Sequence, residues 1–159
     1  MKRLLLSALI FVSAKGLAQD SLDLDPITIT SSRVDQQVSK TGRSVTIIPG
    51  HSLHNIPAQS IDDILKYAAG MNIQQRGPAG SQADIVLRGG TFQQVLVLVD
   101  GMRINDPITG HFSAYFPILP DQIERIEILK GPSAALYGPE AVGGVVHIIS
   151  KTFVSASNR

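Results

Sequence analysis

Apolar and polar positions between residues 45 and 150 alternate in a way that predicts several short strands, one helix and glycine-rich loops. The run Val95 to Val99 is apolar throughout, which predicts a central strand buried on both faces. Asp100-Gly101 follows it and predicts a tight hairpin turn. Residues 122–129 alternate between apolar and polar side chains, as a strand with one face on a core does. Further strands are expected near residues 45–48, 72–76, 84–88, 102–105 and 145–150.

One helix is expected after Ser60, which is a natural N-cap residue with Asp63 three positions later, as in a capping box. Gly70 lies where a glycine would end this helix. Its apolar positions recur at helical spacing and comprise Ile61, Ile64, Leu65 and Ala68. The pattern therefore predicts an α+β fold: a small mixed β-sheet with short helices and long loops, one of them at 106–120.

The first residues have the pattern of a secretory signal peptide. Lys2 and Arg3 precede an apolar run of nine residues, and Ala18 is a small residue suited to a cleavage site. Nine residues are too few for a membrane-spanning helix, which needs about 20. We expect residues 1–18 to be removed on export, and residues 19–44 to form a flexible, polar leader.

One short segment of the leader favours an extended conformation. Ile and Thr alternate there, and both are β-branched. The segment comprises Asp25, Pro26, Ile27, Thr28, Ile29 and Thr30. Such a segment is suited to pairing with the sheet edge of another protein, or to serving as the first strand of the domain.

Composition and motifs exclude several kinds of chemistry. Lys and Arg number 14 against 13 Asp and Glu, so no nucleic-acid-binding face is expected, and the absence of Cys excludes disulfides and thiolate sites. Trp is absent and other aromatic residues are few, so we expect no strands of a membrane barrel in this chain. His51 and His54 are expected in a solvated loop, and no phosphate-binding or catalytic-triad motif is present. We expect no enzymatic activity, cofactor or metal.

Five motifs follow one another in a specific order. They are residues 84–89 (DIVLRG), 95–103 (VLVLVDGMR), 123–132 (IERIEILKGP), 135–138 (ALYG) and 141–150 (AVGGVVHIIS). In this order they resemble the plug domain of TonB-dependent outer-membrane receptors, most of all that of the vitamin B12 receptor. The likeness extends over about residues 25–150, with residues 45–150 as the plug and residues 25–30 similar to the TonB box.

The resemblance implies a mechanical function. In such receptors the plug closes a β-barrel, and a ligand bound on the outer side exposes the TonB box on the periplasmic side. The box then pairs as a strand with the C-terminal domain of TonB, and energised pulling lets the ligand pass. The implied ligand is a scarce nutrient such as cobalamin or a ferric siderophore.

The resemblance also implies roles for individual residues. Ligand-contacting loops would lie at residues 77–82, 90–93 and 105–112. Their side chains suited to hydrogen bonding or stacking are Gln82, Phe92, Gln93, Asn105, Asp106, Thr109, His111 and Phe112. Two basic residues of family plugs face acids of the barrel wall, and they correspond here to Arg88 and Lys130. Lys cannot bind a carboxylate through two parallel N–H bonds as Arg does, so we expect a weaker contact at Lys130.

Residues 151–159 are expected to be a polar tail where a barrel would begin. A barrel needs at least 8 strands of roughly 10 residues each, and nine residues follow Ser150. We therefore expect a truncated or interrupted receptor, located in the outer membrane when whole. A plug separated for study is a second reading. The third is a stand-alone periplasmic module that binds TonB or a ligand without transport.

Overall fold

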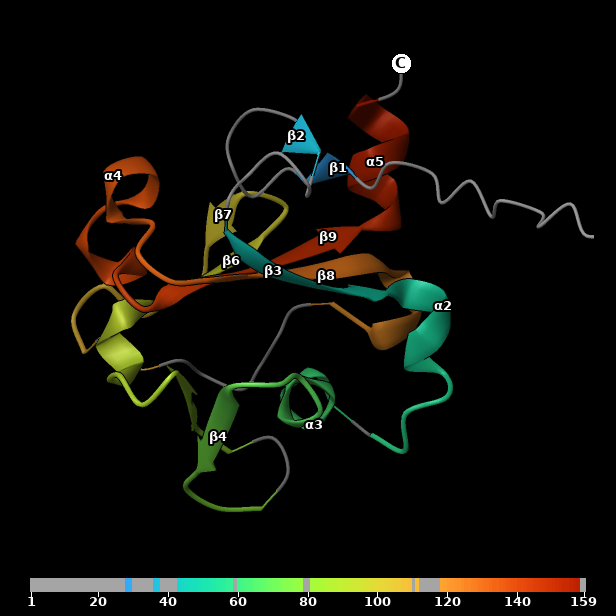
Figure 1. The fold of residues 1–159 in the computed structure, drawn as a ribbon. Helices are drawn as coiled ribbons and strands as arrows, with labels where there is room; N and C mark the ends of the chain where they lie inside the picture. Colours follow the sequence, from blue (N-terminus) through green and yellow to red (C-terminus); the bar gives the residue numbers. More distant parts are fainter. Residues whose placement is uncertain are drawn as a thin grey trace, which may run out of the picture.

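A five-stranded mixed sheet forms the centre of the molecule, which is described by a computed structural model (Figure 1). The structure describes residues 43–58, 60–78, 81–109, 111 and 118–157, and the backbone of two short strands at 28–29 and 36–37. The strand order is β3-β8-β9-β6-β7. The strands are β3 (Ser44–Pro49), β6 (Val95–Val99), β7 (Met102–Arg103), β8 (Ile123–Lys130) and β9 (Gly144–Ser150). The expected signal peptide lies outside the described residues.

The sheet is mixed because β9 pairs with β8 in the antiparallel sense and with β6 in the parallel sense. Strands β6 and β9 are buried at every position, as the unbroken apolar run of β6 predicts. The hairpin turn after β6 is confirmed: Asp100 has φ 50° and Gly101 has φ 82°, so both central residues have the positive φ of a two-residue turn. Strand β7 continues for only two residues after this turn.

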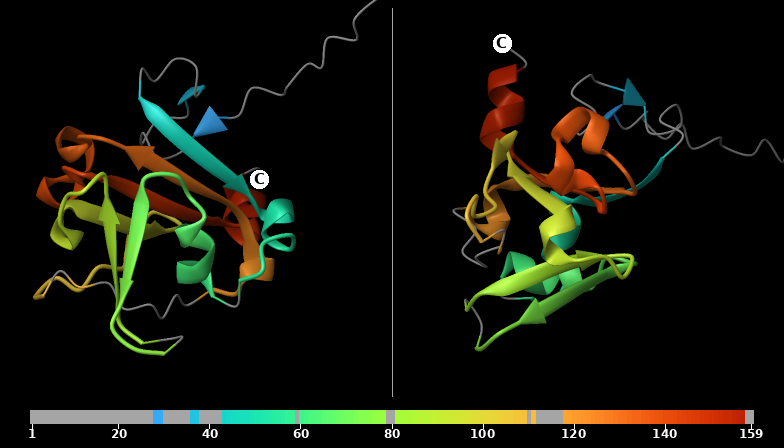
Figure 2. Two further views of the ribbon diagram at one scale, coloured as in Figure 1. Left: turned by 60° about the horizontal axis from the view of Figure 1, so that its bottom comes forward. Right: turned by 90° about the vertical axis from the view of Figure 1, so that its left-hand side faces the viewer.

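One face of the sheet is covered by helix α3 (Ile61–Lys66) and by the hairpin of β4 (Met71–Gln75) and β5 (Ala83–Leu87), which lie below it in Figure 1 and come forward in the left view of Figure 2. The apolar positions predicted for α3 are all buried in the same core cluster as alternate residues of β6, β8 and β9. Ser60 occupies the predicted N-cap position, but its side chain makes no capping hydrogen bond.

The opposite face carries helix α4 (Ala134–Tyr137) and the 3-10 turn η4 (Pro139–Ala141), where the sequence indicated only a glycine-rich loop. These elements bury Tyr137 and Ala141 in a second cluster, which also contains Leu96, Leu98, Leu129 and Val145. At the start of β9, Gly144 lets the strand lie close to β8 and to Leu87 of β5. A Cβ atom at this position would collide with the carbonyl oxygen of Leu129 and lie 2.7 Å from Leu87 Cδ1.

Within the expected polar tail, Lys151–Ser157 form helix α5, which the sequence did not predict. Its start is fixed by side chains distant in sequence. The Asp100 carboxylate accepts hydrogen bonds from Ser150 N and Oγ, each at 2.7 Å, and Ser150 Oγ accepts one from Phe153 N at 3.0 Å. The hairpin turn after β6 thus holds the residue that caps α5.

The expected loop around the two N-terminal histidines is also in part wrong. His51 lies within helix α2 (Gly50–Leu53), and His54 is its C-cap residue. Both side chains are exposed, as expected for solvated residues.

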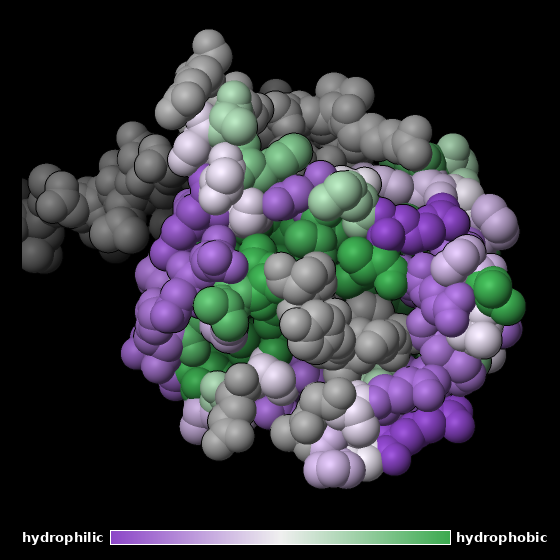
Figure 3. Space-filling view, turned by 180° about the vertical axis from the view of Figure 1, so that it is seen from behind, coloured by the Kyte–Doolittle hydropathy of each residue, from purple (hydrophilic) through white to green (hydrophobic). Residues whose placement is uncertain are grey.

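Viewed from behind, apolar residues gather in the middle of the surface and hydrophilic residues surround them (Figure 3). The large apolar side chains that are exposed in the described part of the chain are Tyr67, Met102, Ile108, Leu119, Val142 and Phe153. None of the helices in the part that the structure describes has the length and apolar character needed to span a bilayer.

Candidate functional site

The predicted ligand loops meet around one buried carboxylate, that of Asp84 in β5. Its side chain is 1% exposed. Its Oδ1 lies 2.8 Å from Nδ1 of His111, and its Oδ2 accepts hydrogen bonds from Arg76 Nε at 3.3 Å and Nη2 at 3.1 Å. Arg76 follows β4, and His111 belongs to the long loop after β7. Asp84 therefore joins the hairpin β4–β5 to that loop.

Aromatic stacking adds a third loop to this group. The rings of Phe92 and His111 lie 4.3 Å apart between centroids, with 11° between their planes. Phe92 begins the 3-10 turn η2 (Phe92–Gln94), which leads into β6. His111 is thus held at its edge by Asp84 and on one face by Phe92. The sequence reasoning proposed both aromatic residues, whereas the predicted partner Phe112 lies outside the described residues.

Asp106 and Thr109 maintain the shape of the loop that carries His111. Asp106 accepts hydrogen bonds from Ile108 N at 2.8 Å and from Thr109 Oγ1 at 2.8 Å. The bond from the Ile108 N–H, followed by that from the Thr109 hydroxyl, lowers the pKa of the Asp106 carboxyl. Thr109 Oγ1 in turn accepts a bond from His111 N at 3.3 Å. Both residues are exposed, and their polar atoms mainly serve the loop itself.

The expectation that the Asn105 amide is available to a ligand is wrong. Asn105 is 8% exposed, its Oδ1 accepts a hydrogen bond from Val97 N at 2.7 Å, and its Nδ2 donates one to Val95 O at 3.0 Å. The amide completes the edge of β6, so its role is structural. Gln82 and Gln93 are exposed at the hairpin and at η2.

Sequence reasoning missed Asp84 and Arg76. Asp84 is the only charged residue in a strand that is otherwise apolar, and that was the available signal. A buried acid needs partners, but neither partner is identifiable from spacing. Arg76 is eight residues away and His111 is 27 residues away.

The two predicted barrel-facing cations lie at the same end of the molecule. Arg88 follows β5 with a positive φ of 51°, and a Cβ atom built on Gly131 would lie 3.6 Å from Arg88 Nη1. Gly131 is the residue after Lys130, the last residue of β8. Within the described residues, neither Arg88 nor Lys130 forms an ion pair.

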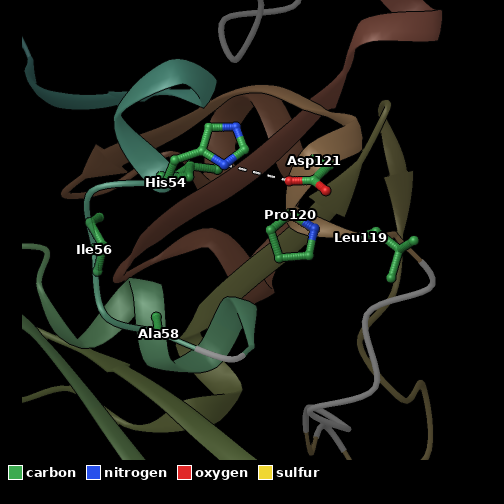
Figure 4. A pocket seen from close by; sticks show the side chains of 7 residues that line it. His54, Ile56, Ala58, Leu119, Pro120 and Asp121 are labelled. Carbon is green, nitrogen blue, oxygen red and sulfur yellow. Dashed lines mark ion pairs between the residues drawn. The ribbon is translucent and has the colours of Figure 1, made fainter.

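A surface pocket of about 360 Å³ lies between the end of α2 and the 3-10 turn η3 (Pro120–Gln122) (Figure 4). Its lining residues are Leu53, His54, Ile56, Ala58, Leu119, Pro120 and Asp121. His54 Nδ1 and Asp121 Oδ1 approach to 3.6 Å at its rim, and both side chains are well exposed. None of the predicted site residues lines this pocket, so it is separate from the ligand loops.

Part of the predicted TonB box is in an extended conformation. Thr28 and Ile29 form strand β1, which pairs with β2 (Gln36–Gln37) in the antiparallel sense. The other members of the segment, Asp25, Pro26, Ile27 and Thr30, lie outside the described residues.

Comparison with known proteins identifies the family. Residues 37–145 match the family model described as the TonB-dependent receptor plug domain. A vitamin B12 transporter, BtuB, of Vibrio vulnificus is 35% identical over 139 residues, covering 87% of this chain and 23% of the relative. The ferric enterobactin receptor PfeA of Pseudomonas aeruginosa, solved as a point mutant in complex with enterobactin, is similar in structure, with a TM-score of 0.55 and 32% identity over 70% of this chain and 18% of that receptor.

A second solved structure leads to the same family. The siderophore receptor PirA of Acinetobacter baumannii has a TM-score of 0.54 and 32% identity, over 67% of this chain and 17% of its own. The chain thus spans less than a quarter of the length of the relatives it matches. The relatives are transporters and receptors by description. Because the family model matches residues 37–145, most of the folded part, the chain belongs to the TonB-dependent receptor plug domain family.

Proposed function

We propose that this chain is the plug of an outer-membrane receptor that takes up a scarce nutrient of the cobalamin or ferric-siderophore type with energy delivered by TonB. The match of residues 37–145 to the plug family carries the proposal. The relatives add the two ligand classes, since one transports vitamin B12 and others are siderophore receptors. The plug contributes mechanics and ligand contacts, and no reaction is part of this function.

The ligand contacts are assigned to the loops around Asp84. Phe92 and His111 offer ring surface, and the exposed amides of Gln82 and Gln93 offer hydrogen bonds. The hydrogen bond between Thr109 and Asp106 maintains the shape of the loop that carries His111. Three segments distant in sequence meet here, as a ligand site on the end of a plug requires.

The barrel contact is assigned to Arg88 and Lys130. The structure brings these two cations to one end of the molecule, and neither has an acidic partner among the described residues. A surrounding barrel with acidic side chains opposite Arg88 and Lys130 would supply these partners. Such pairs are shielded from solvent inside a receptor, and they contribute little on an exposed surface.

The TonB contact is assigned to residues 25–30. Backbone pairing with a sheet edge needs an extended strand with free N–H and C=O groups, and Thr28 and Ile29 are already extended. Because β1 is paired with β2 on one side, TonB would either add at the other side of β1 or replace β2.

Substitution of Ile27 by Pro tests the TonB assignment. Proline removes the N–H and restricts the backbone, so the strand loses a hydrogen bond at its centre. Titration of this chain with the C-terminal domain of TonB should give clear binding, and the Ile27→Pro variant should lose at least tenfold in affinity, which is about 1.4 kcal/mol. Ser39→Pro, in the leader but outside the box, is the matched control and should bind as the parent does. Equal affinity of the parent and Ile27→Pro would refute the assignment.

Cell location is tested separately. Antiserum against residues 45–150 should detect its antigen in the outer-membrane fraction of the source organism. Detection in the periplasm alone would favour a binding module without transport.

A further inference from the structure

The turn between β6 and β7 is bonded to the last part of β9 by several hydrogen bonds. Asp100 N donates one to Ile148 O at 2.9 Å, and Gly101 N donates one to Nε2 of His147 at 3.0 Å. The Asp100 carboxylate accepts two more from Ser150, from N and from Oγ, each at 2.7 Å. The end of β9 is thus held by a turn that precedes it by 46 to 50 positions in the sequence.

Helix α5 depends on this attachment, because its side chains are little buried. It extends from the end of β9 away from the sheet (Figures 1 and 2). Among residues 151–156, Val154 is half-buried and the others are exposed. The first turn is held by Ser150 Oγ, which accepts a hydrogen bond from Phe153 N at 3.0 Å while it donates to Asp100. A helix of seven residues with so little packing is marginal in water, so we expect its stability to follow that of its cap.

The hydrogen bond from Gly101 requires the neutral form of His147. Because Nε2 accepts this bond, the proton of the neutral ring is on Nδ1. His147 is buried, and its Nδ1 has no hydrogen-bond partner among the described residues. A proton added to Nε2 would place one donor against another, the Gly101 N–H group. The Asp100 carboxylate could accept from the new donor, but it already serves Ser150.

The charges around His147 do not remove the cost of protonating it in the closed structure. Burial lowers the pKa of His147 below its usual value, the carboxylates of Glu127 and Asp100 oppose this shift, and Arg125 adds to it. Glu127 lies opposite His147 in the pairing of β8 with β9, and its Oε1 accepts a hydrogen bond from Arg125 Nε at 2.8 Å. The other charged residues of β7, β8 and α5 are exposed or half-buried and comprise Arg103, Glu124, Lys130 and Lys151.

We propose that the turn Asp100-Gly101, His147 and Ser150 form a proton-linked clasp, which holds α5 on the sheet at neutral pH and releases it in acid while the rest of the sheet remains folded. In the released form His147 reaches water and binds a proton near its usual pKa of 6.5, which the closed form resists. Release therefore becomes more favourable as the pH falls through 6.5. The ratio of released to closed molecules should rise by up to about tenfold between pH 7.5 and 5.5. The clasp lies outside the ligand loops and the TonB box, so this inference does not depend on the proposed function.

Native-state hydrogen exchange of the full chain, followed by NMR at pH 7.5 and 5.5, tests the clasp. Protection factors are compared, because they correct for the direct effect of pH on the exchange chemistry. Protection of the Phe153 amide should fall by up to about tenfold at pH 5.5. Small additions of urea should leave it unchanged, since release of one short helix exposes little surface, whereas the buried Val146 amide should respond to urea. Equal protection of Phe153 at both pH values would overturn the proposal, as would a urea response as steep as that of Val146.

Two substitutions test the parts of the clasp. His147→Gln retains an acceptor for Gly101 N and binds no proton in this pH range, so the Phe153 amide should be equally protected at both pH values. Ser150→Ala removes the oxygen that joins Asp100 to Phe153 N but retains the bond from Ser150 N, so protection should be low at both pH values. A pH response of His147→Gln equal to that of the parent would overturn the proposal, as would undiminished protection in Ser150→Ala.

The matched control is His51→Gln, which removes an exposed histidine of α2 outside the clasp. It should retain the parent's loss of protection at pH 5.5. Loss of the pH response in both histidine variants would assign the effect to histidines in general and overturn the proposal. In the folded parent, the ring signals of His147 should titrate with a midpoint below 6.5, and a midpoint at or above this value would contradict the closed form.

Discussion

At the scale of single residues, His147 is a titratable side chain buried within the sheet. It is 4% exposed in the middle of β9, and its Nε2 accepts a hydrogen bond from Gly101 N at 3.0 Å. Its Nδ1 has no hydrogen-bond partner among the described residues. Burial lowers the pKa of His147 below its usual value. The carboxylates of Glu127 and Asp100 oppose that shift, and Arg125 adds to it.

This environment predicts a loss of stability in acid. The folded-state pKa of His147 lies below 6.5, so as the pH falls through 6.5 the unfolded chain binds a proton that the folded chain does not. The free energy of unfolding should therefore fall with decreasing pH, by up to about 1.4 kcal/mol per pH unit. His147→Gln, which retains an acceptor for Gly101 N, should reduce this slope. Urea unfolding at pH 7.5 and 5.5 measures the difference.

The matched control is His51→Gln, which changes an exposed histidine of α2. It should leave the parent's pH dependence in place. Identical slopes in the parent and His147→Gln would show that other groups govern the acid response.

At the scale of elements, Gly50 determines how α2 packs on β8. A Cβ atom at Gly50 would collide with the carbonyl oxygen of Ile123 and lie 2.8 Å from that of Glu124. Both contacts are with backbone, which cannot move aside as a side chain can. The close approach lets α2 bury Leu53 in the main core cluster.

Gly50→Ala should destabilise the fold by about 1–3 kcal/mol, the usual cost of forcing an extra carbon into a packed site. Chemical unfolding of the variant measures this cost. Gly70→Ala is the comparison: nothing lies within 4 Å of its Cβ position, and its φ of +80° should cost only about 1 kcal/mol. A smaller loss in Gly50→Ala than in Gly70→Ala would mean that α2 shifts at little cost.

At the scale of the whole molecule, stability should decrease from β9 towards the edges of the sheet. Strand β9 is bonded on both sides and is buried at all seven positions, whereas β7 pairs through two exposed residues. Backbone amides of Val145 to Ile149 should exchange hydrogen most slowly, and those of β7 most rapidly. Native-state hydrogen exchange followed by NMR measures this order. Protection of β7 equal to that of β9 would indicate a single cooperative unit.

Local patterns predicted most strands of this fold and helix α3, but not helices α2, α4 and α5. The strand Val95–Val99, the turn at Asp100-Gly101 and the apolar face of α3 were all predicted from periodicity and turn chemistry, and most other strands were placed within one or two residues. These features depend on neighbours within a few positions, which the sequence displays directly. The family was indicated separately, by the resemblance of the five ordered motifs to known plug domains.

Pairing across long separations was decided only in three dimensions. Several contacts join residues that lie 8 to 50 positions apart in the sequence. They are the parallel pairing of β6 with β9, the contacts of Asp84 with Arg76 and His111, the hydrogen bonds of Asn105 to β6, and the capping of α5 through Asp100 and Ser150. Periodicity specifies which side of an element is buried, but many partners would satisfy it. The choice among them depends on packing and on the need of buried polar groups for hydrogen bonds, which only the assembled structure meets.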